Sequence, residues 1–329
     1  MLQFLANVLE QMDLALDQLA VDDANYKRFA LMLVDNVVEL TLHKYAIEKS
    51  NWNEMWQGLP PKYPPKLVAE ALGQHFESKA KLAAETGYIS AKTKETITIL
   101  HSFRNEVYHQ GMAHEKILSA VSLFYFQNAC ELLERFSPGV FSFGDRQQIP
   151  HRAKKYLGAK PNYESLGLFI SACKRLRDIS ESFKSDLTGD LAGQIELMVE
   201  EADHNIQFLA DDGLGEKSRE AALIYVQLWD FAWTPKAKEF AKANGCAAKT
   251  ELDYLEWLKR HYDWKYRKDP IPSWEKRLAT LRIEKDPHRS LLLYKNFADQ
   301  TEDIRRFLRA AAASLANYIQ TEIGRARGK

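Results

Sequence analysis

The chain has few of the residues that would indicate a disulfide-rich, zinc-binding or secreted protein. Only three of its 329 residues are cysteines. Cys130, Cys173 and Cys246 lie far apart and form no CxxC pair, so neither a disulfide framework nor a zinc site is expected. A reducing cytoplasm fits this cysteine content best. No motif indicates a cofactor or a bound metal, and we expect none.

Long apolar runs and an excess of one charge are also missing. No apolar run approaches membrane-spanning length, and no basic leader precedes an apolar core at the N-terminus. A cytoplasmic protein that is neither exported nor bound to a membrane is therefore expected. Lys and Arg together number 45, as do Asp and Glu. Any contact with RNA must then come from a local patch and not from the overall charge.

Strand patterns are equally scarce. No stretch alternates apolar and polar residues beside convincing β-turn signals, and no repeat of fixed period is visible. Apolar residues instead recur at three- and four-residue intervals, as in helices that bury one face. This periodicity predicts an all-α protein with helices at about 2–20, 25–49, 66–85, 93–107, 115–136, 163–183, 191–209, 216–233, 249–262 and 291–323.

Residues 137–165 interrupt the helical pattern and mark the best domain boundary. Prolines and glycines are spread through this segment, as is typical of a linker. The length of the chain and its 46% of hydrophobic residues suffice for two cores. We expect an N-terminal helical bundle over residues 1–145 and a second helical domain over residues 146–329.

The segment 103–111 places an arginine, an asparagine and a histidine at one predicted helix end. Asn105 and His109 are four residues apart and share a helix face, and the long side chain of Arg104 reaches the same space. Gly111 offers a helix stop. A histidine at a helix C-terminus meets the negative end of the helix dipole, which keeps it near the titration range useful for proton transfer.

This segment resembles the motif of the HEPN superfamily. Members of that all-α family carry an Arg, then Asn or another polar residue, then a His four to six positions after the Arg, between the last two helices of a small bundle. Arg104, Asn105 and His109 match this order, and Tyr108 and Gly111 fit the frequent Tyr-His-x-Gly form. The resemblance covers roughly the first 140 residues.

Two acids on the predicted helix 25–49 are the other site candidates. Asp35 is expected to cap or to face solvent, although it is a supporting candidate. Glu39 is the counterpart of the acid that the resemblance places on this helix, and it is expected to orient Arg104 or His109. Tyr108 is expected to be a packing or hydrogen-bonding neighbour. Three further histidines near the motif are interpreted as surface or core residues: His75, His101 and His114.

The residues and the resemblance together predict a metal-independent endoribonuclease. When the 2′-hydroxyl of RNA attacks the adjacent phosphorus, the protein need only move protons and stabilise the phosphorane. His109 suits the first task and Arg104 the second, with Asn105 as a neutral donor or a support for the arginine. HEPN ribonucleases form homodimers in which two motifs converge, so a dimer through the N-terminal domain would supply a second histidine.

Two alternatives stay open. The first is a non-catalytic HEPN-like module that binds RNA or protein. The second is a toxin or phage-defence effector, because the family is associated with such systems, and an antitoxin or regulatory protein would then be a partner.

The second half carries one basic and aromatic segment, within residues 257–289. Basic groups contact phosphates while rings stack on unpaired bases, so this segment is a candidate for binding single-stranded RNA. The alternative is a charged face over tryptophans packed in the core. The candidate residues are Lys259, Arg260, Trp264, Lys265, Tyr266, Arg267 and Lys268.

Overall fold

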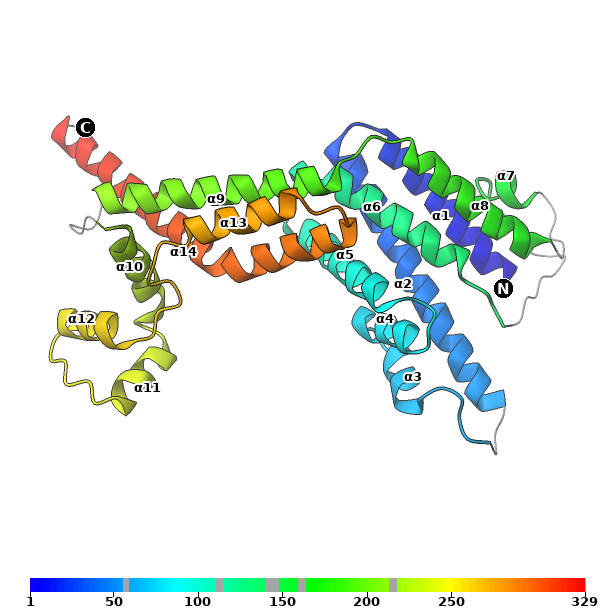
Figure 1. Cartoon of the computed structure of the whole chain (residues 1–329), viewed down its shortest axis with the longest axis horizontal. Helices are drawn as coiled ribbons and strands as arrows, with labels where there is room; N and C mark the ends of the chain where they lie inside the picture. Colours follow the sequence, from blue (N-terminus) through cyan, green and yellow to red (C-terminus); the bar gives the residue numbers. More distant parts are fainter. Residues whose placement is uncertain (56–58, 111–114, 140–147, 159–163, 213–217, 329) are drawn as a thin grey trace. The chain divides into compact units, whose positions relative to one another are not determined.

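The computed structural model confirms the all-α class. It describes residues 1–55, 59–110, 115–139, 148–158, 164–212 and 218–328, without the side chains of 108–110 and 212. These residues form fourteen helices and no strand (Figure 1). None of these helices is long and apolar enough to cross a membrane.

The chain divides into two compact units whose boundary differs from the expected one. Unit 1 comprises Met1–Asp190 and Asp286–Leu292, and unit 2 comprises Leu191–Lys285 and Leu293–Lys329. The segment expected to separate two domains, residues 137–165, therefore lies inside unit 1.

The centre of unit 1 is a ring of four helices. Helix α1 contacts α2 and α8, and α6 also contacts α2 and α8. Each helix turns an apolar stripe inward, as its periodicity predicts. The bounds are α1 Leu2–Ala20, α2 Ala24–Met55, α6 Glu115–Glu134 and α8 Ser165–Glu181.

Three further helices pack beside α2, and the last of them carries the motif. They are α3 (Pro65–Ala71), α4 (Phe76–Glu85) and α5 (Ala91–Gln110), with α4 and α5 in contact with α2 and with each other. The single helix expected over residues 66–85 is wrong, because the chain breaks between α3 and α4. Lys79 stabilises the break by donating from Nζ to the carbonyl of Gln74 at 3.1 Å.

The segment after α6 is held on α1 by a buried carboxylate. Asp13 is 1% exposed. Its oxygens accept hydrogen bonds from Arg152 Nη1 at 2.9 Å and Tyr156 at 2.5 Å, and contact Lys155. Short helix α7 (Lys154–Leu157) forms part of this segment. Although burial acts in the opposite direction, hydrogen bonds from Lys155, Tyr156 and Arg152 lower the pKa of Asp13. These contacts explain why no domain boundary lies here.

Unit 2 contains two groups of helices. In the first, α13 is tied to α14 by Trp274 and Phe297, whose ring centroids lie 5.6 Å apart. Arg282 of α13 bonds Glu196 of α9 at 2.5 Å. In the second, helices α10 to α12 surround a small core that includes Trp264 and Leu258. The bounds are α9 Leu187–Asp212, α10 Arg219–Phe231, α11 Pro235–Ala243, α12 Glu251–His261, α13 Ile271–Arg282 and α14 Pro287–Ala326.

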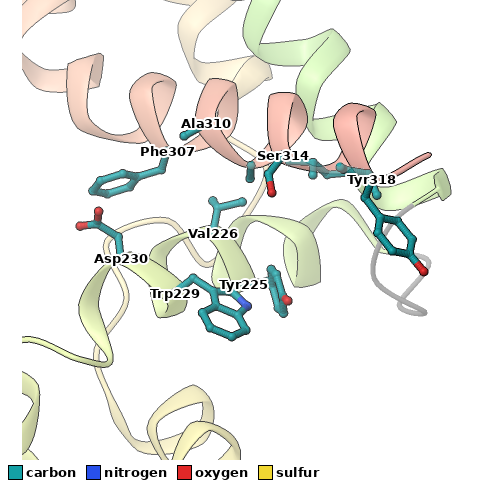
Figure 2. Close-up of a pocket in the computed structure, with 11 residues that line it drawn as sticks. Tyr225, Val226, Trp229, Asp230, Phe307, Ala310, Ser314 and Tyr318 are labelled. Atoms are coloured by element: carbon teal, nitrogen blue, oxygen red, sulfur yellow. The ribbon is translucent and has the colours of Figure 1, made fainter. Parts of the chain in front are cut away.

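Between α10 and α14, within unit 2, lies a cavity of about 550 Å³. Figure 2 shows Val226 between the two helices, with Trp229, Phe307 and Tyr318 along the lining. Among the described residues that line it, Asp230 alone carries a charge. The described lining therefore offers no cation to an anionic ligand.

Asp13→Asn is expected to lower the free energy of unfolding by about 2 kcal/mol at neutral pH, because its donors lose an ionised acceptor. The pKa of Asp13 is lower in the folded chain than in the unfolded chain. Its contribution is therefore complete above the unfolded pKa and is lost as the pH falls through the folded pKa. Denaturant unfolding at neutral pH and at about pH 2 measures both limits, and wild type and variant should converge at the lower pH.

Asp17→Asn is the matched control. Asp17 contacts the same arginine, Arg152, but its side chain is 54% exposed, so the loss should stay below about 1 kcal/mol. An Asp13→Asn loss that is the same at both pH values would contradict the prediction.

Candidate functional site

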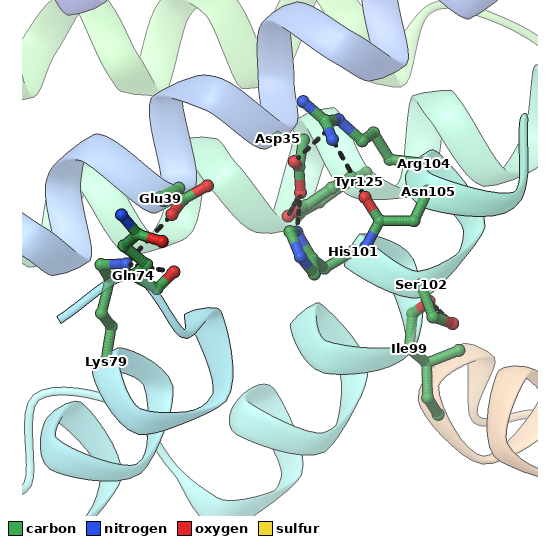
Figure 3. A network of polar contacts seen from close by, with 10 residues as sticks. All are labelled: Asp35, Glu39, Gln74, Lys79, Ile99, His101, Ser102, Arg104, Asn105 and Tyr125. Carbon is green, nitrogen blue, oxygen red and sulfur yellow. Dashed lines mark hydrogen bonds and ion pairs between the residues drawn. The ribbon is translucent and has the colours of Figure 1, made fainter. Parts of the chain in front are cut away.

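The candidate site is built around the carboxylate of Asp35 (Figure 3). This side chain is 1% exposed. Its Oδ1 accepts a hydrogen bond from the hydroxyl of Tyr125 at 2.8 Å and lies 2.9 Å from Nδ1 of His101. Its Oδ2 lies 3.3 Å from Nε of Arg104. The expectation that Asp35 caps a helix or faces solvent is wrong, because Asp35 is buried on a side of α2 that packs against α5 and α6.

Arg104 is held in place but not buried. Its side chain keeps 33% exposure while Nε faces Asp35. Its Nη1 donates to Oδ1 of Asn105 at 2.9 Å. Asn105 therefore supports the arginine, one of the two roles expected for it. A guanidinium that is oriented on one side and accessible on another can bind a phosphate in a fixed geometry.

His101 belongs to the same network, although it was expected to be a surface or core residue like His75 and His114. It lies on α5 three residues before Arg104, so both side chains project from one helix face. Its ring stacks on Phe76 of α4, with centroids 4.0 Å apart and planes at 4°. The spacing from Arg104 is the signal that could have identified it.

Tyr125 is the network's buried donor. It is 0% exposed on α6. Burial, and then the negative charge of Asp35, raise the pKa of its phenol well above the ordinary value. The hydroxyl therefore stays protonated and continues to donate to Asp35. Sequence reasoning missed it because a tyrosine within an apolar helix usually indicates packing alone.

Glu39 does not contact Arg104, and the expectation that it orients this arginine is wrong. Its Oε1 lies 3.0 Å from Nζ of Lys79 on α4, and its side chain is 35% exposed. Asp35 and Glu39 are one helical turn apart. The turn of α2 that carries Asp35 faces α5, and the turn that carries Glu39 faces α4. Asp35 is therefore the acid that contacts Arg104, which was the role expected of Glu39.

His109 and Tyr108 lie in the last turn of α5, which ends at Gln110. Their side chains lie outside the described residues, as does Gly111. The expected contact between Glu39 and His109 therefore cannot be placed. Arg28 of α2 reaches this helix end, where its Nη2 donates to the carbonyl of Val107 at 3.4 Å. This second arginine near the motif carried no sequence signal.

Three of the candidate RNA-binding residues of unit 2 form hydrogen bonds with the backbone of the same unit. Trp264 is 4% exposed, and its indole nitrogen donates to the carbonyl of Lys259 at 3.1 Å. Lys265 and Tyr266 both donate to the carbonyl of Gln300, at 3.0 and 3.1 Å. Since the Trp264 ring presents no open face, it cannot stack on a base in this conformation.

The remaining cations of that segment lie at the surface. Arg267 donates to the carbonyl of Tyr262 at 2.6 Å, and Arg260 lies 3.9 Å from Glu256. Lys268 is exposed. This arrangement favours the alternative of a charged face over core-packed tryptophans.

Neither a family model, nor a curated protein, nor a solved structure matches this chain. The resemblance to the HEPN superfamily therefore stays a prediction. Over the described ranges, no group of three or more His, Cys, Asp or Glu side chains is arranged to hold a metal ion. The chemistry of the site follows from Asp35, His101, Arg104, Asn105 and Tyr125.

Asp35→Asn is expected to lower the free energy of unfolding by about 3 kcal/mol, because it removes a buried charge while its partners remain. Glu39→Gln, on the same helix one turn later, should cost about 1 kcal/mol or less because the carboxylate is partly solvated. Denaturant unfolding monitored by circular dichroism measures both. Equal losses for the two isosteric changes would contradict a special role for Asp35.

Proposed function

We propose that unit 1 is a metal-independent endoribonuclease in which Arg104 and His109 carry the reaction. The supporting observation is the pair formed by Asp35 and Arg104. A buried carboxylate orients the arginine, yet a third of its side chain remains exposed. An imidazole also lies against this carboxylate, which distinguishes the pair from the structural pair of Asp13 and Arg152.

The reaction needs two proton transfers and stabilisation of added negative charge. The 2′-oxygen of the substrate loses its proton and forms a bond to phosphorus, and the bond from phosphorus to the 5′-oxygen breaks as that oxygen gains a proton. The products are a 2′,3′-cyclic phosphate and a 5′-hydroxyl. An imidazole, with an unperturbed pKa of about 6.5, can take part in either transfer at neutral pH. Arg104 can place two N–H donors on the phosphoryl oxygens, whose charge grows in the transition state.

The resemblance to HEPN ribonucleases extends the proposal to partners. It implies a homodimer through unit 1 that brings two copies of His109 to one RNA cleft, which sedimentation of the purified protein would check. It also implies a toxin or phage-defence effector controlled by an antitoxin or another regulatory protein.

The second candidate function is a non-catalytic module that binds RNA or protein. One observation favours it. The polar partners of Asp35 come from α5 and α6, so the network also stabilises the packing of α2 against these helices. A ribonuclease requires Arg104 for the reaction, whereas a binding module requires it only for packing. An RNA cleavage assay therefore distinguishes the two candidates.

Arg104→Ala and His109→Ala are each expected to reduce RNA cleavage at least about 100-fold with little loss of helicity, because each removes a group needed in the transition state. Arg104→Lys should rescue poorly, since a point charge cannot reproduce two parallel donors. Cleavage of a labelled RNA mixture measures all three.

A matched control for these changes is Arg325→Ala, because Arg325 is an exposed arginine of unit 2 outside the candidate RNA-binding segment. Its activity should equal that of the wild type. An active His109→Ala protein would refute the assignment of His109, and RNA binding without cleavage by the wild type would favour the non-catalytic module.

Cleavage should continue in a chelator, leave 2′,3′-cyclic phosphate and 5′-hydroxyl ends, and spare DNA, because the nucleophile is the substrate's own 2′-hydroxyl and not a metal-activated water. A single 2′-deoxyribose at a mapped cut site should stop cleavage there. The ends are identified by mass spectrometry. Activity that EDTA removes and magnesium restores, or 5′-phosphate ends, would overturn this mechanism.

A further inference from the structure

A second histidine shares a carboxylate with Arg104. His101 lies 2.9 Å from one oxygen of Asp35, and Arg104 lies 3.3 Å from the other. Both side chains come from α5, three residues apart, so one buried group holds the arginine and an imidazole close together. Figure 3 shows them on either side of the Asp35 carboxylate.

The contact with Asp35 determines which ring nitrogen can accept a proton. An ionised carboxylate only accepts hydrogen bonds, so Nδ1 of His101 is the donor in this contact. In the neutral ring, Nε2 then carries the lone pair. Among the described residues, Nε2 has no hydrogen-bond partner, and the side chain keeps 19% exposure. The nitrogen suited to taking a proton is thus left available.

The ring is also held in orientation. Its stacking on Phe76, with planes at 4° and centroids 4.0 Å apart, restricts rotation away from Asp35. Tyr125 donates to the same oxygen, Oδ1, and so helps to keep this carboxylate in place. Such an arrangement, in which a carboxylate orients an imidazole, is one that general bases use.

We propose that His101 is the general base of the reaction in unit 1, with Asp35 as its positioning residue; this rests on the proposed ribonuclease function. Nε2 takes the proton of the 2′-hydroxyl while the 2′-oxygen bonds to phosphorus and the bond to the 5′-oxygen breaks. His109, in its proposed role, gives the proton to the leaving 5′-oxygen.

Charged and polar groups face the ring of His101 from several helices. Asp35 faces it from α2, Tyr125 lies beyond that carboxylate on α6, and Arg104 is on α5 itself. Helix α4 presents Phe76, while its Lys79 is paired with Glu39. Because only the neutral ring accepts a proton, kcat/KM should fall on the acidic side as the imidazole becomes protonated.

The test is His101→Gln. The amide of glutamine can still donate to Asp35 but cannot take a proton at neutral pH. We expect a loss in kcat/KM of at least about 100-fold and disappearance of the acidic limb contributed by the imidazole.

Two control variants accompany His101→Gln. His75→Gln changes an exposed histidine before α4 and should behave as the wild type. Tyr125→Phe removes another contact to Asp35 but no base, and should lose less than about tenfold with the wild-type pH profile.

A second variant, His101→Ala, tests the general-base role even if His101→Gln does not fold. His101→Ala opens space beside Phe76, and added imidazole should restore part of its activity with a pH dependence that follows the free base. Absence of any rescue, with the variant folded by circular dichroism, would count against the general-base role.

Three outcomes overturn the inference. If wild type cleaves, Arg104→Ala does not, and His101→Gln cleaves normally with an unchanged pH profile, the general-base role is wrong while the ribonuclease function stands. If Tyr125→Phe loses as much activity as His101→Gln and neither changes the pH profile, the histidine acts only by supporting Asp35. If the wild type cleaves no RNA, the proposed function and the inference fall together.

Discussion

Burial of the Asp35 carboxylate is the constraint on which the site depends. A charge removed from water is stable only if polar partners replace its hydration. Here His101 of α5 and Tyr125 of α6 hydrogen-bond to Oδ1, and Arg104 of α5 forms an ion pair with Oδ2. One buried carboxylate therefore orients an arginine and an imidazole at the same time. The same interactions stabilise the packing of α2 against the helix that carries the motif.

Asp13 provides an instructive comparison within unit 1. It is as buried as Asp35 and also has several donors, but they belong to the short segment with Arg152 and Tyr156. That network holds the segment with Arg152 and Tyr156 on α1. The helix that follows this segment, α8, therefore belongs to the same unit. Burial of a charged group alone does not identify a functional site. Arg152 and Arg104 keep the same exposure, 33%, so the difference at Asp35 is that a histidine shares its carboxylate with the arginine.

Unit 2 is built mainly by apolar and aromatic packing. Trp264 is buried, and aromatic rings form part of the apolar lining of the cavity between α10 and α14. In both places the rings stabilise the packing of the helices. Two of its helices that the periodicity did not predict have start signals in the sequence: Thr234 and Pro235 open α11, and Pro270 with Pro272 opens α13. Capping rules could have found both. With nine residues, α11 presents few turns in which hydrophobic periodicity could be visible.

The sequence by itself determined the all-α class, the bounds of α1 and the placement of Arg104 and Asn105 on one helix, because these depend on interactions within a few residues. Only the tertiary structure decided which acid meets Arg104. Asp35 and Glu39 occupy the same helix face one turn apart, so local spacing treats them alike. Their environments differ because α5 lies beside one turn of α2 and α4 beside the next. Tyr125 and Lys79 are likewise partners far along the chain, and no local pattern encodes such contacts.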